Sequence, residues 1–190
     1  MNLHTQIKNL FNDEHVLQHP IEKYEETSTI MIDEINRANP DVVLDLGCGN
    51  NIYKGKIKNL IGVDILDNNL QDVNAPIEDL PFDDNYADVV LALGSINFGD
   101  DELIDKQLSE LKRVSKPNAK VFFRVIEQHK LEPYYPWTLE KVLERTQKHG
   151  FYCVEMPRHI YRTRRPHKEH DDRTGNRSLT RIYCVWKVIK

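Results

Sequence analysis

Two glycines follow a short apolar run in the stretch Val42–Asn50, which reads V-V-L-D-L-G-C-G-N. Glycines at this point let the backbone turn sharply after a strand and approach a ligand closely. The amide groups of such a turn can hold a negative group, for example the carboxylate of an amino acid. Gly47 and Gly49 therefore predict a ligand-binding turn, and an ordinary strand–loop junction with two glycines is the alternative.

An acidic residue, Asp64, lies near the end of the next apolar run, Leu60–Ile65. It follows Asp45 by 19 positions (64 − 45), and an offset of about 20 residues is typical of an acid that accepts hydrogen bonds from a ribose. A helix N-cap or a surface aspartate is the alternative. A nicotinamide-binding turn is disfavoured, because its fingerprint requires a third glycine where the chain has Ile52.

The elements that must position these residues follow from hydrophobic patterning. Nearly continuous apolar runs, typical of strands buried in a parallel sheet, occur at 41–46, 60–65, 87–93 and 120–125. Closing strands are predicted over 151–154 and 182–188, and helices over 3–12, 21–37, 138–149 and the stretch between Asp100 or Asp101 and a break at Pro117. Alternating strands and helices predict right-handed βαβ units, with the ligand at the carboxyl ends of the strands.

Two further stretches extend this pattern to a family. They are Asp72–Asn74 and Glu78–Val90, the second reading E-D-L-P-F-D-D-N-Y-A-D-V-V. With the glycine turn and Asp64, the chain resembles the class I S-adenosylmethionine (SAM) dependent methyltransferases, closest to the small enzymes with a V-L-D-L-G-C-G first motif. The resemblance runs from about Val42 to Val125. Leu111–Lys120 is similar to the family's approach to its fifth strand.

This resemblance implies an α/β fold, namely a single Rossmann-like domain over 1–190. Its sheet would be mostly parallel and seven-stranded, with an antiparallel last strand and helices on both faces. We divide the chain into an N-terminal helical cap (1–40), a SAM-binding core (41–126) and an acceptor-side half (127–190) with a basic hairpin at 158–181. The implied activity is methyl transfer from SAM by in-line displacement, with no metal site.

The resemblance also assigns roles to single positions. The implied cofactor-binding residues are Asp45, Gly47, Cys48, Gly49, Asp64, Ile65, Asp72, Val73, Asp79, Leu93 and Gly94. Gly47 and Gly49, with Asp45 beside them, would hold the methionine part, and Asp64 the ribose. The adenine amino group would contact Asp72 or Asp79, and we favour Asp72 because it lies at the expected end of the third strand.

Two departures from the family pattern concern the segment after the first strand. Asn51 replaces the usual third glycine, and asparagine adopts a left-handed backbone less freely than glycine. The stretch Asn50–Asn59 is short and polar, which predicts that the family's first helix is reduced to a turn. A catalytically degenerate SAM-fold binding or regulatory module is therefore the alternative function.

For the residues that contact the methyl acceptor, the sequence gives candidates without a defining motif. Methyl transfer needs alignment of the acceptor, and such positioning supplies roughly 7–11 kcal/mol, whereas a general base is required only for a protonated acceptor. Candidates that follow strand ends are Asn97, Glu127 and His129. The stretch Tyr134–Trp137 is predicted as an aromatic wall over the substrate or as the packed entry to a helix. Tyr24 and the N-terminal helices are predicted as a cofactor lid or as core packing.

Basic residues concentrate in the predicted hairpin. They are Arg158, Arg162, Arg164, Arg165, Lys168, Arg173, Arg177 and Arg181. This arm could contact phosphate on a nucleic acid or a phosphorylated metabolite, and a solvated loop is the alternative. The net charge of −4 disfavours a protein that binds nucleic acid over its whole surface. We therefore expect a small-molecule or phosphate-bearing acceptor, with nucleic-acid binding through the arm as a less favoured alternative.

Composition is consistent with one domain of an ordinary globular protein, at 190 residues with 39% apolar and 29% charged residues. No apolar run approaches the roughly 20 residues that span a bilayer, so no membrane partner is expected. Three widely spaced cysteines give neither a disulfide framework nor zinc-ligand spacing. We therefore expect a cytoplasmic protein.

Overall fold

The computed structural model describes residues 2–10, 25–67, 69–127, 133–161 and 180–190. Within these ranges the strands form one seven-stranded sheet in the order β3-β2-β1-β4-β5-β7-β6. The strands are β1 (Val43–Leu46), β2 (Leu60–Asp64), β3 (Val73–Asn74), β4 (Ala87–Leu93), β5 (Ser115–Ile126), β6 (Phe151–Tyr161) and β7 (Thr180–Val188). β7 runs antiparallel to β5 and β6, and the other paired strands are parallel. The predicted fold class is confirmed.

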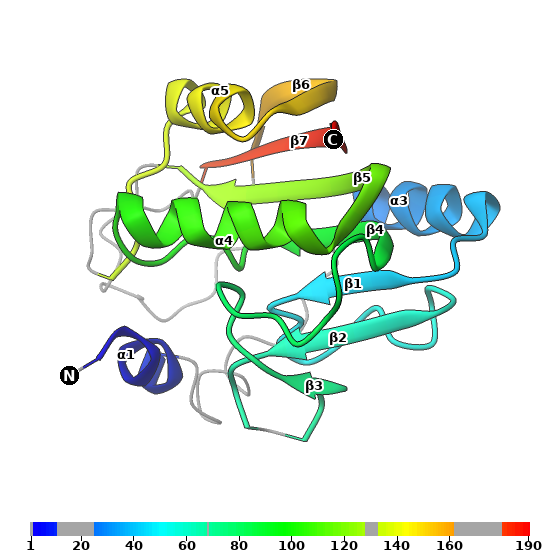
Figure 1. Cartoon of the computed structure of the whole chain (residues 1–190), viewed down its shortest axis with the longest axis horizontal. Helices are drawn as coiled ribbons and strands as arrows, with labels where there is room; N and C mark the ends of the chain where they lie inside the picture. Colours follow the sequence, from blue (N-terminus) through cyan, green and yellow to red (C-terminus); the bar gives the residue numbers. More distant parts are fainter. Residues whose placement is uncertain (1, 11–24, 68, 128–132, 162–179) are drawn as a thin grey trace, which may run out of the picture.

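Helices cover both faces of the sheet (Figure 1). The helices are α1 (Leu3–Leu10), α3 (Glu25–Ala38), α4 (Asp101–Val114) and α5 (Leu139–Lys148). Ile104, Leu108 and Leu111 of α4 enter the core on one face, and Met31 and Ile35 of α3 enter the core on the other. No helix in the described ranges is both long and apolar enough to cross a membrane.

Burial explains why the strand predictions succeeded. All four residues of β1 are buried, as its continuous apolar run indicates. Capping fixes the helix starts, since the Asp100 carboxylate accepts a hydrogen bond from the Leu103 amide at 3.0 Å. Thr138 caps α5 in the same way through the Lys141 amide.

Three predicted boundaries are wrong. Pro117 does not end the helix: α4 ends at Val114, and Pro117 lies inside β5, which begins at Ser115. The last two strands are longer than predicted, because β6 continues to Tyr161 and β7 begins at Thr180. The ends of the predicted basic hairpin 158–181 are therefore strand, and its central part, 162–179, lies outside the described residues.

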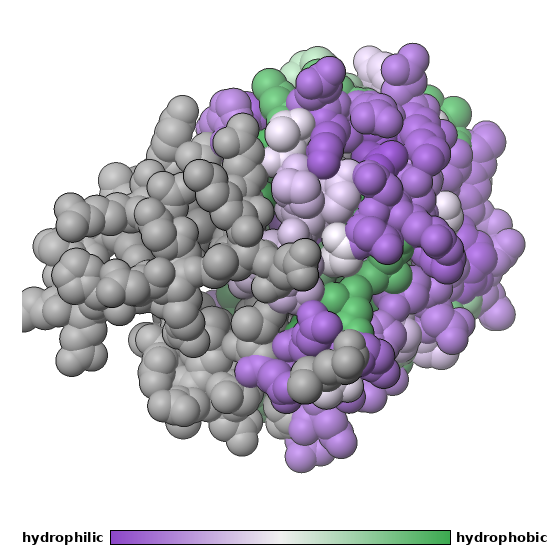
Figure 2. Space-filling view, turned by 90° about the vertical axis from the view of Figure 1, so that its left-hand side faces the viewer, coloured by the Kyte–Doolittle hydropathy of each residue, from purple (hydrophilic) through white to green (hydrophobic). Residues whose placement is uncertain are grey.

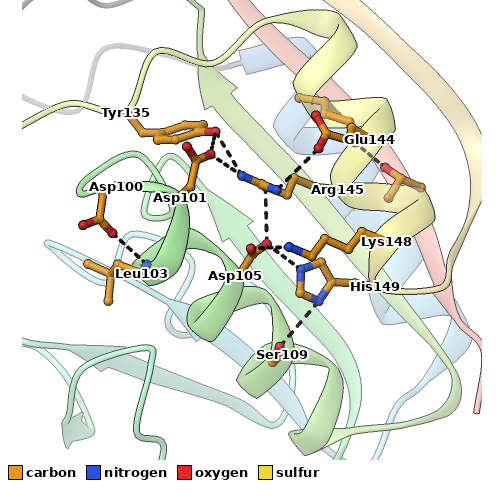
Figure 3. Close-up of polar contacts among 12 residues, drawn as sticks. Asp100, Asp101, Leu103, Asp105, Ser109, Tyr135, Glu144, Arg145, Lys148 and His149 are labelled. Atoms are coloured by element: carbon orange, nitrogen blue, oxygen red, sulfur yellow. Dashed lines mark hydrogen bonds and ion pairs between the residues drawn. The ribbon is translucent and has the colours of Figure 1, made fainter.

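A group of charged side chains joins α4 to α5, and we call it the Arg145 cluster (Figure 3): Asp101, Asp105, Tyr135, Glu144, Arg145, Lys148 and His149. Arg145 is buried, with 5% of its surface exposed, and its guanidinium pairs with Asp101 and Asp105. Lys148 and His149 meet the Asp105 carboxylate at 2.5 and 2.9 Å. These pairs fix the first turns of α4, which border the candidate site described below.

Candidate functional site

The glycine turn after β1 packs against the loop that follows β4. Gly47 has a positive φ of 70°, and its amide donates to the Val63 carbonyl at 2.7 Å. A Cβ atom at Gly47 would lie 2.3 Å from the Cβ of Ser95, so this position admits no side chain. At Gly49 nothing lies within 4 Å of such a Cβ, which leaves open space above that backbone.

Asp64, at the end of β2, faces the same space. Its carboxylate accepts hydrogen bonds from the Gly49 amide at 2.7 Å and from the Leu66 amide at 2.9 Å. Burial raises the pKa of the Asp64 carboxyl, and these backbone hydrogen bonds oppose the rise. Two backbone hydrogen bonds thus hold the Asp64 carboxylate beside the glycine turn.

Asp45, the remaining acid of this region, is buried in β1 with 3% of its surface exposed. Burial, reinforced by the nearby Asp64 and opposed by Arg124, raises the pKa of the Asp45 carboxyl to about 7. A buried carboxyl with a raised pKa beside a ligand cavity is typical of a functional site, because a bound cation would complete its charge balance.

A cavity lies at the carboxyl ends of β1, β2 and β4, and Asp45 is not among the residues that line it. From the strand ends and the loops after them come Gly47, Gly49, Asp64, Ile65, Leu66, Ala75, Ile77, Glu78, Gly94, Ser95 and Phe98. Figure 2 looks onto this edge of the sheet and shows a hydrophobic strip there bordered by hydrophilic surface. Of the predicted cofactor residues, the structure brings Gly47, Gly49, Asp64, Ile65 and Gly94 together in this lining.

Helices complete the cavity with residues that the sequence analysis did not select: His4 and Ile7 of α1, and Leu103 and Gln107 of α4. Glu78 is also new as a site residue, although it lies in a stretch that supported the resemblance. The Glu78 carboxylate meets His4 Nε2 at 2.5 Å and Gln107 Nε2 at 3.3 Å. No sequence motif indicates these three residues, because only the packing of α1 and α4 brings them together.

Several predicted residues lie outside this lining. The Asp72 carboxylate binds Lys54 Nζ at 2.7 Å and the Gly62 amide at 2.8 Å, while Asp79 is exposed. Cys48 is buried, Val73 lies in β3, and the Leu93 carbonyl accepts from Arg124. Glu127 pairs with His159 at 2.9 Å. His129 and Tyr24 lie outside the described residues.

The loop after β4 owes its shape to Asn97 and to the aromatic stretch 134–137. Asn97 is buried, donates to the Gly94 carbonyl at 2.7 Å and accepts from the Ile126 amide at 2.9 Å. The Trp137 indole donates to the Ile96 carbonyl at 2.8 Å. Trp137 and Tyr135 are fully packed, at 0% and 2% exposed. Of the two predictions for these aromatics, packed entry to α5 therefore describes Tyr135 and Trp137.

The expected loss of the family's first helix is confirmed. Turns and single bridges, without a helix, occupy 50–59. Asn51 adopts a left-handed backbone with φ of 50°, as the missing glycine requires, and its side-chain amide donates to the Leu70 carbonyl at 2.8 Å. The altered segment thus forms a defined turn that leaves Gly47, Gly49 and Asp64 in place.

Comparison with known proteins agrees with this arrangement. Residues 44–123 match the family model described as a methyltransferase domain. No curated protein matches the chain. Among solved structures, a Burkholderia thailandensis 1,6-didemethyltoxoflavin-N1-methyltransferase with bound 1,6-didemethyltoxoflavin and S-adenosylhomocysteine is 14% identical, with a TM-score of 0.73, over 98% of this chain and 87% of that one.

Two other structures show the same fold. The N-methyltransferase NodS of Bradyrhizobium japonicum WM9, in complex with S-adenosylhomocysteine, is 9% identical with a TM-score of 0.68 over 100% of both chains. A second structure is the Haloferax volcanii complex between the Trm112 methyltransferase activator and a methyltransferase. The matching chain in it is 17% identical with a TM-score of 0.73, over 100% of this chain and 98% of that one. At these identities the likeness is evidence of fold.

The class of protein follows from the family match over 44–123 together with the fold. Residues 44–123 match a methyltransferase domain, and the sheet has the fold of methyltransferase structures, two of which were solved with S-adenosylhomocysteine. The predicted resemblance and enzyme class are confirmed.

Proposed function

We propose that this methyltransferase acts on a small, uncharged acceptor, and that the cavity described above holds both SAM and the reacting end of that acceptor. The observation that carries this proposal is the charge of the lining. Among the described lining residues the ionisable side chains are His4, Asp64 and Glu78, and none is Lys or Arg. A phosphate or carboxylate acceptor requires cationic partners, so this lining favours the small-molecule prediction over the phosphate-bearing one.

The residues of the cavity suit the cofactor. Gly49 leaves open space above its backbone for the methionine part, and the buried Asp45 carboxyl of β1 offers a partner to a cationic group. Asp64 offers carboxylate oxygens to the ribose, and Ile65 offers an apolar surface to the adenine. The Ser95 hydroxyl oxygen is buried in the lining without a hydrogen-bond partner among the described residues, which indicates a polar ligand atom beside it.

SAM, when bound, supplies an activated methyl group on a sulfonium cation. The chain's own part is to align the acceptor and exclude water, for which it provides the apolar side chains of Ile7, Phe98 and Leu103 next to Ser95. The Burkholderia neighbour is consistent with this class of acceptor, since the molecule bound to it beside S-adenosylhomocysteine is the small molecule 1,6-didemethyltoxoflavin.

A thermal unfolding scan with SAM, S-adenosylhomocysteine and NAD tests the cofactor site. A ligand at 100 times its Kd stabilises by about 2.7 kcal/mol, which raises the Tm by roughly 5–10 °C in a chain of this size. We expect this shift with SAM and S-adenosylhomocysteine, no shift with NAD, and loss of the shift in Asp64→Asn. Asp72→Asn, which changes an acid outside the cavity, is the matched control and should keep the shift.

Transfer of a labelled methyl group from SAM to panels of neutral heterocycles, amines and phosphorylated metabolites then tests the acceptor class. Labelling confined to phosphorylated compounds would contradict the acceptor proposal while leaving the cofactor site intact. Absence of any thermal shift with S-adenosylhomocysteine would contradict the cofactor site itself and favour the degenerate module.

A further inference from the structure

A buried amide in the cavity has a carbonyl oxygen without a partner. Gln107 of α4 lines the cavity and is 6% exposed. Its Oε1 atom is buried and has no hydrogen-bond partner among the described residues. An unsatisfied buried carbonyl costs about 1–3 kcal/mol unless a ligand or water completes it. The described structure therefore lacks a hydrogen-bond donor at this point.

The orientation of this amide follows from Glu78. A carboxylate only accepts hydrogen bonds, so the group of Gln107 that lies 3.3 Å from Glu78 must be its NH₂. His4 Nε2 approaches the other Glu78 oxygen at 2.5 Å and holds the carboxylate from the α1 side. The carbonyl oxygen of Gln107 is consequently left to accept a hydrogen bond from a ligand.

Topology places this oxygen at the adenine end of the cavity. The strand order runs β3-β2-β1-β4, so the cavity residues after β3 lie beyond Asp64 on the side away from Gly94 and Ser95. Ala75, Ile77 and Glu78 follow β3 directly. A cofactor with its ribose at Asp64 and its methyl near Ser95 must therefore extend its base toward Ile77 and Glu78.

The two acids that the resemblance offers for the base are poorly placed. The Asp72 carboxylate is paired with Lys54 and the Gly62 amide, and Asp79 is exposed. Neither lines the cavity in the described structure. Asp64 and Glu78 are the only carboxylates in the lining among the described residues, and Asp64 is bonded to the glycine turn.

We propose that Gln107, oriented by Glu78, recognises the amino group of the adenine through its Oε1 atom. This assignment rests on the proposed function, because it assumes that SAM occupies the cavity. A side chain from α4 would then determine base specificity in place of the acids near β3. Gln107 Oε1 and the Glu78 carboxylate accept hydrogen bonds, so an amino group on the base can donate to them. A carbonyl oxygen in the same place can only accept, and it would leave these acceptors without a donor.

The test compares S-adenosylhomocysteine with S-inosylhomocysteine, in which a carbonyl oxygen replaces the adenine amino group. Isothermal titration measures the Kd of each ligand for the full chain. We expect the wild type to bind the inosine compound about 10–100-fold more weakly, because an unsatisfied buried pair of acceptors costs about 1–3 kcal/mol. In Gln107→Leu this ratio should fall about tenfold, because the oriented carbonyl is gone.

Gln71→Leu is the matched control. Gln71 also has a buried Oε1 without a partner among the described residues, but it does not line the cavity, so its variant should keep the wild-type ratio. Equal binding of the two ligands by the wild type, which needs no variant to fold, would overturn the proposal. A ratio that is unchanged in Gln107→Leu would overturn it as well. Failure of S-adenosylhomocysteine to bind the wild type at all would instead contradict the proposed function.

Discussion

Helix α4 carries a polar group on each of two sides, and the two groups differ in what they leave unpaired. Toward α5, the Arg145 cluster sets a buried guanidinium against Asp101 and Asp105 (Figure 3). Toward the loop after β3, Gln107 contacts Glu78 and keeps a buried oxygen without a partner among the described residues. The first group pairs its buried guanidinium with two carboxylates, whereas the second leaves the Gln107 oxygen without a donor among the described residues.

This difference separates a structural role from a binding role on one helix. Buried polar groups without partners are rare in folded proteins, and each requires an explanation. For Gln107 we take a ligand as the explanation, since this residue lines the cavity. For the Arg145 cluster the one such atom, Arg145 Nε, lies 3.4 Å from the Asp105 carboxylate in an ion pair, and the role of the cluster is to hold α4 against α5.

Arg145→Met should produce the largest change. It removes the guanidinium from Asp101, whose side chain is 72% exposed, and from Asp105, which keeps Lys148 and His149, so the loss is smaller than for a fully buried pair. We expect the free energy of unfolding in urea to fall by about 2–3 kcal/mol, the value of hydrogen bonds to a charged group, or the Tm to fall by roughly 5–10 °C. The ratio of Kd values for S-adenosylhomocysteine and S-inosylhomocysteine should not change, because the cluster does not touch the cavity.

Lys106→Met provides the control for that variant. Lys106 lies on the exposed side of the same helix, where it pairs with Glu102 at 2.9 Å and keeps 61% of its side chain exposed. Such an exposed surface pair contributes little to stability. A loss below about 1 kcal/mol in Arg145→Met, similar to that of the control, would show that the cluster does not hold α4.

The same comparison predicts opposite pH dependence in the two regions. Near the cavity, burial raises the pKa of Asp45 to about 7, whereas in the unfolded chain it is near 4. Between these two pH values the Asp45 carboxyl is protonated in the folded state and ionised in the unfolded state. Stability should therefore fall as the pH rises through this window. In the Arg145 cluster, burial alone would raise the pKa of Asp105, but hydrogen bonds from Lys148 and His149 lower it. The ionised Asp105 carboxylate therefore stabilises the fold at pH values above its pKa in the unfolded chain. This stabilisation is lost as the pH falls below that value.

Asp45→Asn isolates the first effect. The variant should gain on the order of 2 kcal/mol over the wild type at pH 8 and little at pH 4.5, because it removes a buried charge that exists only at the higher pH. Urea unfolding at the two pH values measures this gain. Asp88→Asn is the control, because the pKa of this half-exposed acid is lowered, with its carboxylate bound by Lys116, and it should show no gain at pH 8. An Asp45→Asn gain that did not depend on pH would contradict a protonated Asp45 in the fold.

The sequence predicted the strands and the glycine turn because these depend on local patterns. The continuous apolar run of β1 reports burial on both faces, and Gly47 reports a backbone position where Ser95 excludes a side chain. Asp64 was predicted from spacing along the chain and lines the cavity as expected. Asp72 could not be separated from Asp79 in this way, because its pairing with Lys54 depends on the turn that replaces the first helix.

The rest of the site depends on packing between segments far apart in the sequence. His4, Glu78 and Gln107 meet only when α1 and α4 lie against the loop after β3. A glutamine on a helix carries no motif, and its periodicity indicates only that it faces inward. Its significance appears only when its oxygen is found buried without a partner, and no local pattern encodes that.

Gln107→Leu should give the smallest change in stability without ligand. The substitution removes a buried oxygen that gains no hydrogen bond in the described structure and replaces it with apolar volume. The lost contact with Glu78 is long, at 3.3 Å. We expect the free energy of unfolding to stay within about 1 kcal/mol of the wild type. Urea unfolding without S-adenosylhomocysteine measures this change in stability, and unfolding with the ligand measures the stabilisation that binding adds. A large loss without ligand would show that Gln107, like Arg145, is a structural residue.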